Sequence, residues 1–276
     1  MKKTIFILLD GCGFDVATEN LGFLEHLVQE GQGGKYKILG ELPSSSRPIY
    51  ETLLTGLSVF SHGIVNNSTV RRSKEISVFD LCVDSGLKTA ASAYYWISEL
   101  YVRAPFDPDN DRIRLQSESA INYGIYYYED IYPDSHVFND AEFLRKNCSP
   151  DFLFIHSMNL DDSGHHSGCH SKEHHMTALK VNELMATFMP KWLNAGYQVI
   201  VTADHGMSEM GLHGGNTEVQ RIVPLYLFSE RVRKGSFCES TISQLLIAPL
   251  LCDLLGIEKS PKMKNLEDLG VDLFEK

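Results

Sequence analysis

Aspartate and histidine residues that could bind metal ions follow two apolar segments of the chain. Asp10 comes directly after the apolar run 4–9, and Asp204 with His205 comes directly after the run 197–203. Because the carboxyl ends of parallel strands meet at one edge of a sheet, we expect these side chains to lie close together. Adjacent Asp and His residues are the stronger signal, since a single aspartate after a strand is often only a helix cap.

A second set of possible ligands lies in two other segments. Asp161 is followed four residues later by His165, with Gly164 between them predicting a tight turn, and His213 lies in a glycine-rich loop. Gly206 is expected to let the backbone turn sharply after His205. Carboxylate and imidazole ligands suit zinc, with manganese or iron less favoured. The six side chains together have the right chemistry for two metal ions.

The stretch 42–56 presents a serine at the predicted start of a helix. Ser44, Ser45 and Ser46 precede Pro48, a residue that suits the first helical turn. The unpaired amides and the dipole of a helix N-terminus attract anions, so a phosphate or sulfate could lie beside Ser46. The alternative is that the serine merely caps the helix. The predicted metal ligands elsewhere in the chain favour the anion site.

Other histidines and one cysteine near these segments are predicted not to be ligands. Cys12, close to Asp10, is expected to be a small buried hydrophobic residue. The histidines expected to be solvated residues are His156, His166, His170, His174 and His175.

Short β-rich runs alternate with amphipathic segments along most of the chain. This pattern predicts an α/β fold in which a mostly parallel sheet is covered by helices on both faces. The predicted strands are 4–9, 35–39, 88–94, 151–157, 197–203 and 222–228, and the predicted helices are 18–29, 77–85, 172–194 and 241–255.

The segment 95–135 interrupts this alternation. It is rich in Tyr, Trp, Asp and Pro and has no regular hydrophobic period. It could be an irregular cover over a sheet edge, or a small lid that shapes access for the substrate, and we favour the lid. Residues 1–276 are otherwise expected to form a single α/β domain.

Composition limits the possible partners and location. A chain of 276 residues that is 43% hydrophobic can bury a large core, and its net charge of −11 argues against a surface that binds nucleic acid. The apolar run before Asp10 is too short for a secretory signal or a membrane anchor. Six cysteines without disulfide-module spacing fit reduced thiols, so we expect a cytoplasmic protein that does not bind membranes. The oligomeric state is left open.

The order of these residues resembles the alkaline phosphatase superfamily, and most closely its nucleotide pyrophosphatase/phosphodiesterase branch. The nucleophile segment of that branch contains T-x-x-T-G and then H-G-I/V-x-x-N, patterns met here by 52–56 and 62–67. The patterns D-x-x-G-H-x-x-G, D-H-G-M and H-G-G are met by 161–168, 204–207 and 213–215. The similarity runs in order over nearly the whole chain.

This resemblance implies a catalytic site with two metal ions, most simply zinc, with manganese possible. One ion would be bound by Asp161, His165 and His213, and the other by Asp10, Asp204, His205 and Ser46. Two dications about 4 Å apart can clamp a phosphoryl group. Ser46 would attack phosphorus and form a phosphoserine intermediate, and Asn67 would donate a hydrogen bond to a nonbridging oxygen. The expected substrate is a small phosphodiester, pyrophosphate or phosphomonoester.

Two positions depart from the branch. Serine replaces the usual threonine at position 46, a mild chemical change. Arg47 replaces the usual aromatic residue, and its guanidinium could bind a second phosphate charge and favour monoesters, or could instead be held elsewhere on the surface. The chain is also shorter than typical members, which makes nucleotide specificity doubtful.

Related activities remain as alternatives. A phosphomonoesterase or a phosphosugar mutase would use similar ligands, although the mutases usually carry a larger inserted domain. A sulfatase is disfavoured because Tyr50 stands where its C/S-x-P-x-R pattern requires arginine. A metal-binding protein without catalytic activity is disfavoured by the intact serine and ligand set.

Overall fold

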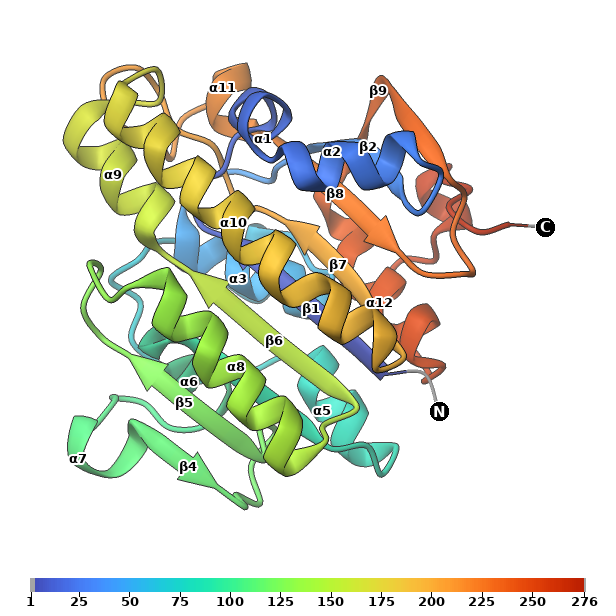
Figure 1. Cartoon of the computed structure of the whole chain (residues 1–276). Coiled ribbons are helices and arrows are strands. Elements are labelled where there is room, and N and C mark those ends of the chain that lie inside the picture. Colours follow the sequence, from blue (N-terminus) through green and yellow to red (C-terminus); the bar gives the residue numbers. More distant parts are fainter. Residues whose placement is uncertain (1–2, 276) are drawn as a thin grey trace.

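A nine-stranded sheet forms the centre of the computed structural model, which describes residues 3–275 (Figure 1). Residues 1, 2 and 276 of the predicted domain lie outside the described residues. The strands are β1 (Lys3–Leu9), β2 (Gly34–Leu39), β3 (Thr89–Tyr94), β4 (Ile113–Leu115), β5 (Tyr123–Tyr127), β6 (Phe152–Ser157), β7 (Tyr197–Thr202), β8 (Ile222–Phe228) and β9 (Gly235–Ser243). Their order in the sheet is β4-β5-β3-β6-β1-β7-β8-β2-β9.

The sheet is mostly parallel, as predicted. Strands β5, β3, β6, β1 and β7 pair in parallel, and β2 pairs in parallel with β9. Strand β8 is antiparallel to both β7 and β2, and β4 is antiparallel to β5. The central strands β1 and β6 are buried along almost their whole length and mostly apolar, because both faces of a parallel sheet are covered.

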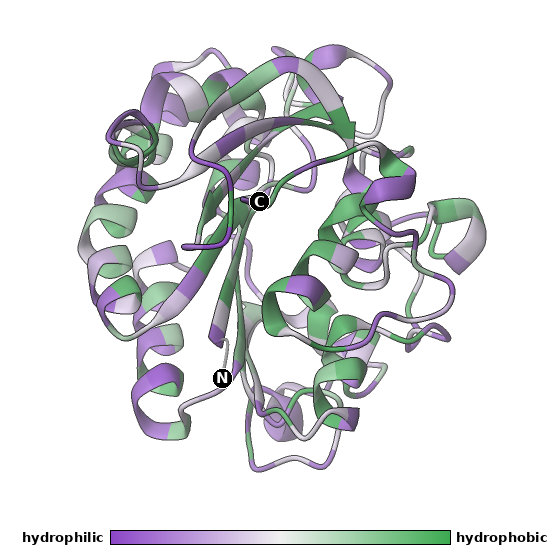
Figure 2. Cartoon of the chain, turned by 90° about the vertical axis from the view of Figure 1, so that its right-hand side faces the viewer, coloured by the Kyte–Doolittle hydropathy of each residue, from purple (hydrophilic) through white to green (hydrophobic). Residues whose placement is uncertain are grey.

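Helices cover both faces of this sheet. They are α1 (Phe14–Asn20), α2 (Gly22–Gln29), α3 (Ser46–Thr55), α4 (Val59–His62), α5 (Val78–Asp84), α6 (Tyr95–Tyr101), α7 (Pro108–Asp111), α8 (Asp134–Cys148), α9 (Asn159–Ser167), α10 (Lys172–Asn194), α11 (Glu218–Arg221) and α12 (Ile247–Leu255), with 3-10 turns η1 (Gln244–Leu246) and η2 (Glu267–Leu269). Figure 2 shows the apolar strands between the two helical layers. Across residues 3–275, each helix is too short or too polar to cross a lipid bilayer.

The long helix α10 illustrates how sequence period sets this packing. Its buried residues recur at intervals of three or four and form one apolar stripe, which includes Ala178, Val181, Met185 and Trp192. Helix α10 contacts β7 and crosses in front of the sheet in Figure 1, together with α8. Helices α3 and α12 lie behind the sheet in the same view. The loops that follow the parallel strands therefore gather at the carboxyl edge of the sheet, which the two layers of helices leave uncovered.

Two predicted helices differ from the observed ones at their ends. The predicted helix 18–29 is divided between α1 and α2, because Leu21 has non-helical dihedrals and the Phe23 amide donates to Asn182 Oδ1 on α10. The predicted helix 241–255 begins late, since Thr241 to Ser243 still pair with β2 as part of β9. In both places a tertiary partner overrides the local sequence signal.

The segment 95–135 is more regular than predicted. It contributes α6, α7, β4 and β5, and β5 extends the central sheet by pairing with β3. Its tyrosines explain this, because aromatic residues suit strands and both Tyr126 and Tyr127 are buried. Only part of the segment is therefore free to act as a lid, and that role stays a prediction.

Candidate metal centre and nucleophile

The predicted metal ligands converge at the carboxyl edge of the sheet. Asp10 follows β1, and Asp204 with His205 follows β7, the neighbouring parallel strand. His205 Nε2 lies 3.2 Å from Asp204 Oδ2 and 3.5 Å from Asp10 Oδ1. The Oγ of Ser46 lies 3.1 Å from the same nitrogen. Asp10, Asp204 and His205 form one group, with ligand atoms close enough to share a single cation, and Ser46 contacts this group through His205.

A second group of side chains lies beside the first. Asp161 Oδ2 is 3.3 Å from His165 Nε2, and Asp161 Oδ1 is 3.8 Å from His213 Nε2. The two imidazole nitrogens of His165 and His213 are 3.2 Å apart. The rings of His205 and His213 stack at 3.9 Å, so the two groups are contiguous. Asp161, His205 and His213 also form a set of suitable spacing, which places His205 between the groups.

Asp161 and His165 lie on helix α9 rather than in the predicted tight turn. Residues four apart share one face of a helix, and this directs both side chains to the same side. Glycine is needed at position 164 for a different reason from the predicted turn, since a Cβ there would lie 2.9 Å from Met207 Cγ. The glycine lets α9 pack against the loop that follows β7.

Gly206 also serves close packing. It lacks the positive φ that a sharp turn would require, and a Cβ there would lie only 2.1 Å from the carbonyl oxygen of Val219. Its own amide donates to Gln220 O at 2.9 Å. The loop bearing His205 therefore lies in close backbone contact with helix α11, which directly precedes β8.

The electrostatics of the two groups are those of a cation site. Burial, followed by repulsion from Asp204 and Asp161, raises the pKa of Asp10 to about 7. Burial and Asp161 raise the pKa of Asp204 to about 8. Burial opposes ionisation of Asp161 as well, but its hydrogen bond with His165 and the nearby imidazoles bring its pKa below the ordinary value. Three carboxylates crowded together in a buried place repel one another unless a positive charge lies between them.

One oxygen of each carboxylate is unpaired at this place. Within residues 3–275, hydrogen-bond partners are missing for the buried atoms Asp10 Oδ1, Asp161 Oδ1 and Asp204 Oδ2. The other oxygen of Asp204 accepts from the Gly11 amide at 3.2 Å. Buried unpaired carboxylate oxygens are costly in a protein interior unless they coordinate a cation. The residues present therefore suit two divalent metal ions.

Ser46 is the first residue of helix α3. Ser45 before it is extended, and Pro48 lies in the first turn, as the sequence predicted. Asn67 packs against this turn, because its Oδ1 accepts from the Arg47 amide at 3.0 Å and from the Ser45 hydroxyl at 3.3 Å. These bonds orient the Asn67 side chain and leave its NH2 as the group that can donate to a bound anion.

The side chain of Arg47 is buried and already paired. It is 1% exposed, its Nη2 lies 2.7 Å from Glu99 Oε2, and its Nη1 donates to Thr69 O at 2.9 Å. The guanidinium also lies 4.5 Å from the ring centre of Trp96. Glu99 and Trp96, both on α6, thus hold Arg47 inside the protein. This placement argues against its contact with a second phosphate charge.

Two histidines predicted to be solvated are fully buried, and that prediction is wrong for them. His156 Nε2 lies 3.0 Å from Asp10 Oδ2, and His174 Nδ1 lies 3.1 Å from the Ser163 hydroxyl. His166 and His170 are exposed, as predicted. The missed signal at His156 is its position in β6, because an imidazole in an otherwise apolar buried strand needs a polar partner. Cys12 is fully buried, as predicted.

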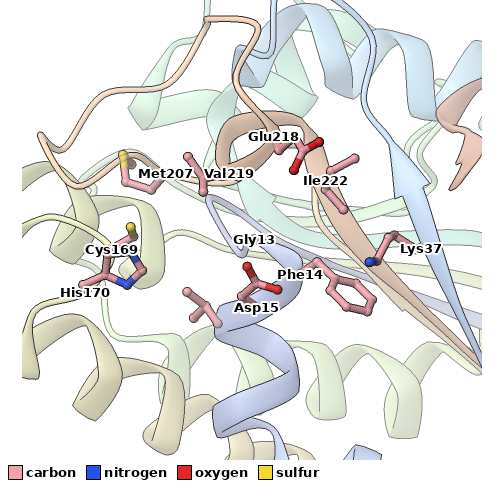
Figure 3. A pocket seen from close by; sticks show the side chains of 11 residues that line it. Gly13, Phe14, Asp15, Lys37, Cys169, His170, Met207, Glu218, Val219 and Ile222 are labelled. Carbon is pink, nitrogen blue, oxygen red and sulfur yellow. The ribbon is translucent and has the colours of Figure 1, made fainter. Parts of the chain in front are cut away.

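A small pocket is lined by residues from several of the loops and helices near the ligands in sequence (Figure 3). It has a volume of about 130 Å³, and Gly13, Cys169 and Met207 are among its lining residues. Each lies only a few positions from a predicted ligand in the sequence, but the described lining contains none of the ligands. The candidate metal centre therefore lies outside this pocket.

The fold and the site together define an α/β protein of the alkaline phosphatase type. A comparison with known protein families matches residues 4–245 to the family model of type I phosphodiesterase / nucleotide pyrophosphatase. The chain belongs to this family, which confirms the resemblance seen in the sequence.

Curated relatives include glycosylphosphatidylinositol (GPI) ethanolamine phosphate transferases. GPI ethanolamine phosphate transferase 2 of Kluyveromyces lactis is 22% identical over 248 residues, which cover 84% of this chain and 30% of the relative. The catalytic subunit of the human enzyme of the same name is 21% identical over 244 residues, covering 83% of this chain and 23% of the relative. The chain therefore spans less than a third of the length of either protein.

Solved structures with the same fold include ectonucleotide pyrophosphatase/phosphodiesterase 5. The murine protein superposes with a TM-score of 0.74 at 15% identity, covering 98% of this chain and all of the other. The human protein gives a TM-score of 0.72 at 15% identity, covering 97% of this chain and 99% of the other. At this identity the likeness concerns the fold.

Proposed function

We propose that the protein is a hydrolase of phosphate esters that uses Ser46 as its nucleophile and two divalent metal ions, most simply zinc. The observation that carries this proposal is the place of the Ser46 hydroxyl, beside His205 at the meeting point of the two ligand groups. Asp10, Asp204 and His205 would hold one ion, and Asp161, His165 and His213 the other. Bound there, two dications would supply the positive charge that favours the serine alkoxide and neutralises the phosphoryl oxygens.

The residues of the chain would divide the remaining work. Ser46 loses its hydroxyl proton and attacks phosphorus, and the bond from phosphorus to the leaving oxygen breaks. The leaving group departs as an alcohol from a diester, where it takes up a proton, or as a phosphate from a pyrophosphate. Water then attacks the phosphoserine ester and restores the serine hydroxyl. The NH2 of Asn67 donates to a nonbridging oxygen, and the first turn of α3 adds its dipole.

We favour phosphodiesters and pyrophosphates over phosphomonoesters. A monoester carries an additional negative charge near neutral pH, and Arg47, which the sequence offered for that charge, is already paired with Glu99. An inactive variant of the murine ectonucleotide pyrophosphatase/phosphodiesterase 5 has been solved in complex with AMP. Nucleotide esters are therefore useful first probes.

Transfer to an alcohol is a second candidate, favoured by the curated relatives, which are named as ethanolamine phosphate transferases. The phosphoserine step would be the same, and an alcohol would replace water in the second step. Adding an alcohol acceptor to the assay separates the two activities through the product formed.

The experiment compares turnover of bis-p-nitrophenyl phosphate and p-nitrophenyl phosphate by the zinc-loaded protein and its Ser46→Ala variant. We expect the diester to be the better substrate and Ser46→Ala to lower its turnover by about 10³-fold or more while metal stays bound. Undiminished turnover by Ser46→Ala would overturn the mechanism. If the wild-type protein binds metal but cleaves neither of these esters nor a nucleotide ester, the result would favour a metal-binding protein without catalytic activity over a hydrolase.

We further propose a cytoplasmic location. All six cysteines are free, and four of them are buried, as suits reduced thiols. Fractionation of cells that express the protein would test this proposal, and recovery from the medium would contradict it.

A further inference from the structure

Asp10 is held by two buried side chains that are not metal ligands. Its Oδ2 accepts hydrogen bonds from the Tyr50 hydroxyl and from His156 Nε2, the latter at 3.0 Å. All three side chains are fully buried. The other oxygen, Oδ1, has no hydrogen-bond partner among residues 3–275 and faces His205 Nε2 at 3.5 Å. The two oxygens of one carboxylate therefore have different environments.

The surroundings of His156 identify which of its nitrogens carries hydrogen. The Tyr94 amide donates to His156 Nδ1 at 3.4 Å, so this nitrogen accepts. Nε2 then carries the hydrogen and donates to Asp10 Oδ2. The ring is packed at 4.8 Å against the Tyr50 ring, and the Tyr127 hydroxyl donates to the His156 carbonyl at 2.9 Å. Packing and hydrogen bonds together fix the orientation of the imidazole.

Tyr50 also connects Asp10 to the nucleophile. It lies four residues after Ser46 on helix α3, so the two side chains share one face of that helix. The hydroxyl of Tyr50 reaches the end of β1, while the hydroxyl of Ser46 reaches His205. One rigid helix thus sets the distance between the serine and the carboxylate.

We propose that Tyr50 and His156 are positioning residues which occupy Oδ2 of Asp10 and so present only Oδ1 to a metal ion. The inference rests on the proposed metal centre, and it adds two residues that the site predicted from the sequence did not include. A carboxylate with one oxygen held by two donors cannot rotate freely or bind a cation through both oxygens. The pair would therefore fix both the geometry and the affinity of the Asp10 site.

Matched variants test this role because the chain contains a similar pair elsewhere. Tyr101 is also a fully buried tyrosine that donates to a buried carboxylate, Glu51 Oε2, at 2.7 Å. His62 is also a buried histidine, and its Nε2 lies 3.0 Å from the Thr52 hydroxyl. The test variants are Tyr50→Phe and His156→Phe, and the controls are Tyr101→Phe and His62→Phe.

The readout is zinc affinity, measured by competition with a chromophoric chelator, without any substrate. It is repeated in a His213→Ala background, where the remaining zinc reports the Asp10 site, and in an Asp204→Asn background, where it reports the other site. We expect Tyr50→Phe and His156→Phe to weaken the Asp10 site by about 10- to 100-fold and to spare the other. Both controls should stay within threefold of the parent protein.

Each outcome separates the positioning role from the proposed function. A wild-type protein that binds no divalent cation would overturn the metal centre and this inference with it. Two bound zinc ions with equal affinities in Tyr50→Phe and Tyr101→Phe would overturn only the positioning role. Melting in the presence of a chelator identifies variants that fail to fold. Should Tyr50→Phe or His156→Phe be among them, the deciding variant is His156→Gln, because the glutamine amide can still donate a hydrogen bond to Asp10. We expect the Asp10 site of this variant to bind zinc with an affinity near wild type. A tenfold loss of that affinity would contradict the positioning role.

Discussion

The Oγ of Ser46 lies 3.1 Å from Nε2 of His205, although 159 positions separate the two residues. The fold creates this contact by placing the N-terminus of α3 beside the loop that follows β7. The same nitrogen lies near a carboxylate oxygen of Asp10 and of Asp204. This contact supports the proposed role of Ser46 as a nucleophile, because cations bound by these groups would favour ionisation of its hydroxyl.

The two ligand groups should lose metal separately. His213→Ala removes a ligand from the Asp161 group, and Asp204→Asn removes a charge from the Asp10 group. We expect each variant to retain about one ion per chain where the wild type holds two, because the group that is not mutated keeps all of its ligands. Emission spectroscopy after dialysis counts the ions. Full loading of His213→Ala would remove this histidine from the ligand set.

Arg47 should matter for stability rather than for ester preference. Arg47→Ala leaves Glu99 buried without its partner, and we expect the free energy of unfolding to fall by about 3–5 kcal/mol. The control is Lys146→Ala, because Lys146 is largely exposed and its partner Glu142 keeps a closer ion pair with Arg145, so stability should change by about 1 kcal/mol or less. Urea unfolding measures both. A stable Arg47→Ala protein with a selective loss of monoester turnover would restore the phosphate-binding role.

The buried carboxyl of Glu51 should make stability depend on pH. Burial raises its pKa from 4.5 to about 7, partly offset by hydrogen bonds from Ser73 and Tyr101. Between these two values the folded state keeps a proton that the unfolded state has lost, so this contribution to the free energy of unfolding falls as pH rises from 4.5 to 7. Relative to Glu51→Gln, the wild type should lose on the order of 3 kcal/mol between pH 4 and pH 8. An unchanged difference in urea unfolding at the two pH values would argue against the buried proton.

Gly206 should be intolerant of a side chain. A Cβ at this position would collide with the backbone oxygen of Val219, so Gly206→Ala must displace the loop that carries His205. We expect a loss of about 1–3 kcal/mol in the free energy of unfolding, together with weaker metal binding. Gly22→Ala is the matched control, because no atom other than those of its chain neighbours and its own helix backbone lies within 4 Å of the added methyl. Equal behaviour of the two variants in thermal melting and zinc titration would refute this packing argument.

The sequence was sufficient to predict the parts of the site that depend on local pattern. Asp10 and Asp204 end apolar strands, and a parallel sheet brings such ends together, so their proximity followed from the strand pattern alone. Ser46 could be placed at a helix start because Pro48 favours the first turn. The predicted sheet also agrees with the observed one across β1, β6, β3 and β7.

Other features depend on packing between distant segments, which a local pattern does not contain. The direction of β8 and the extension of the sheet by β5 are set by tertiary pairing. The burial of Arg47 depends on Glu99, which lies 52 positions later in the chain. Glu99 belongs to helix α6, which packs against helix α3. His156 has no local signal beyond its apolar surroundings, and its partner Asp10 directly follows the adjacent strand β1.

The most direct test of the central claim is to acid-quench the zinc-loaded protein during turnover of a phosphodiester and to map any phosphoryl adduct by mass spectrometry. We predict one adduct per chain at most, located on Ser46 and absent from the Ser46→Ala variant. An adduct on another residue, or undiminished turnover by a Ser46→Ala protein that carries none, would contradict the account.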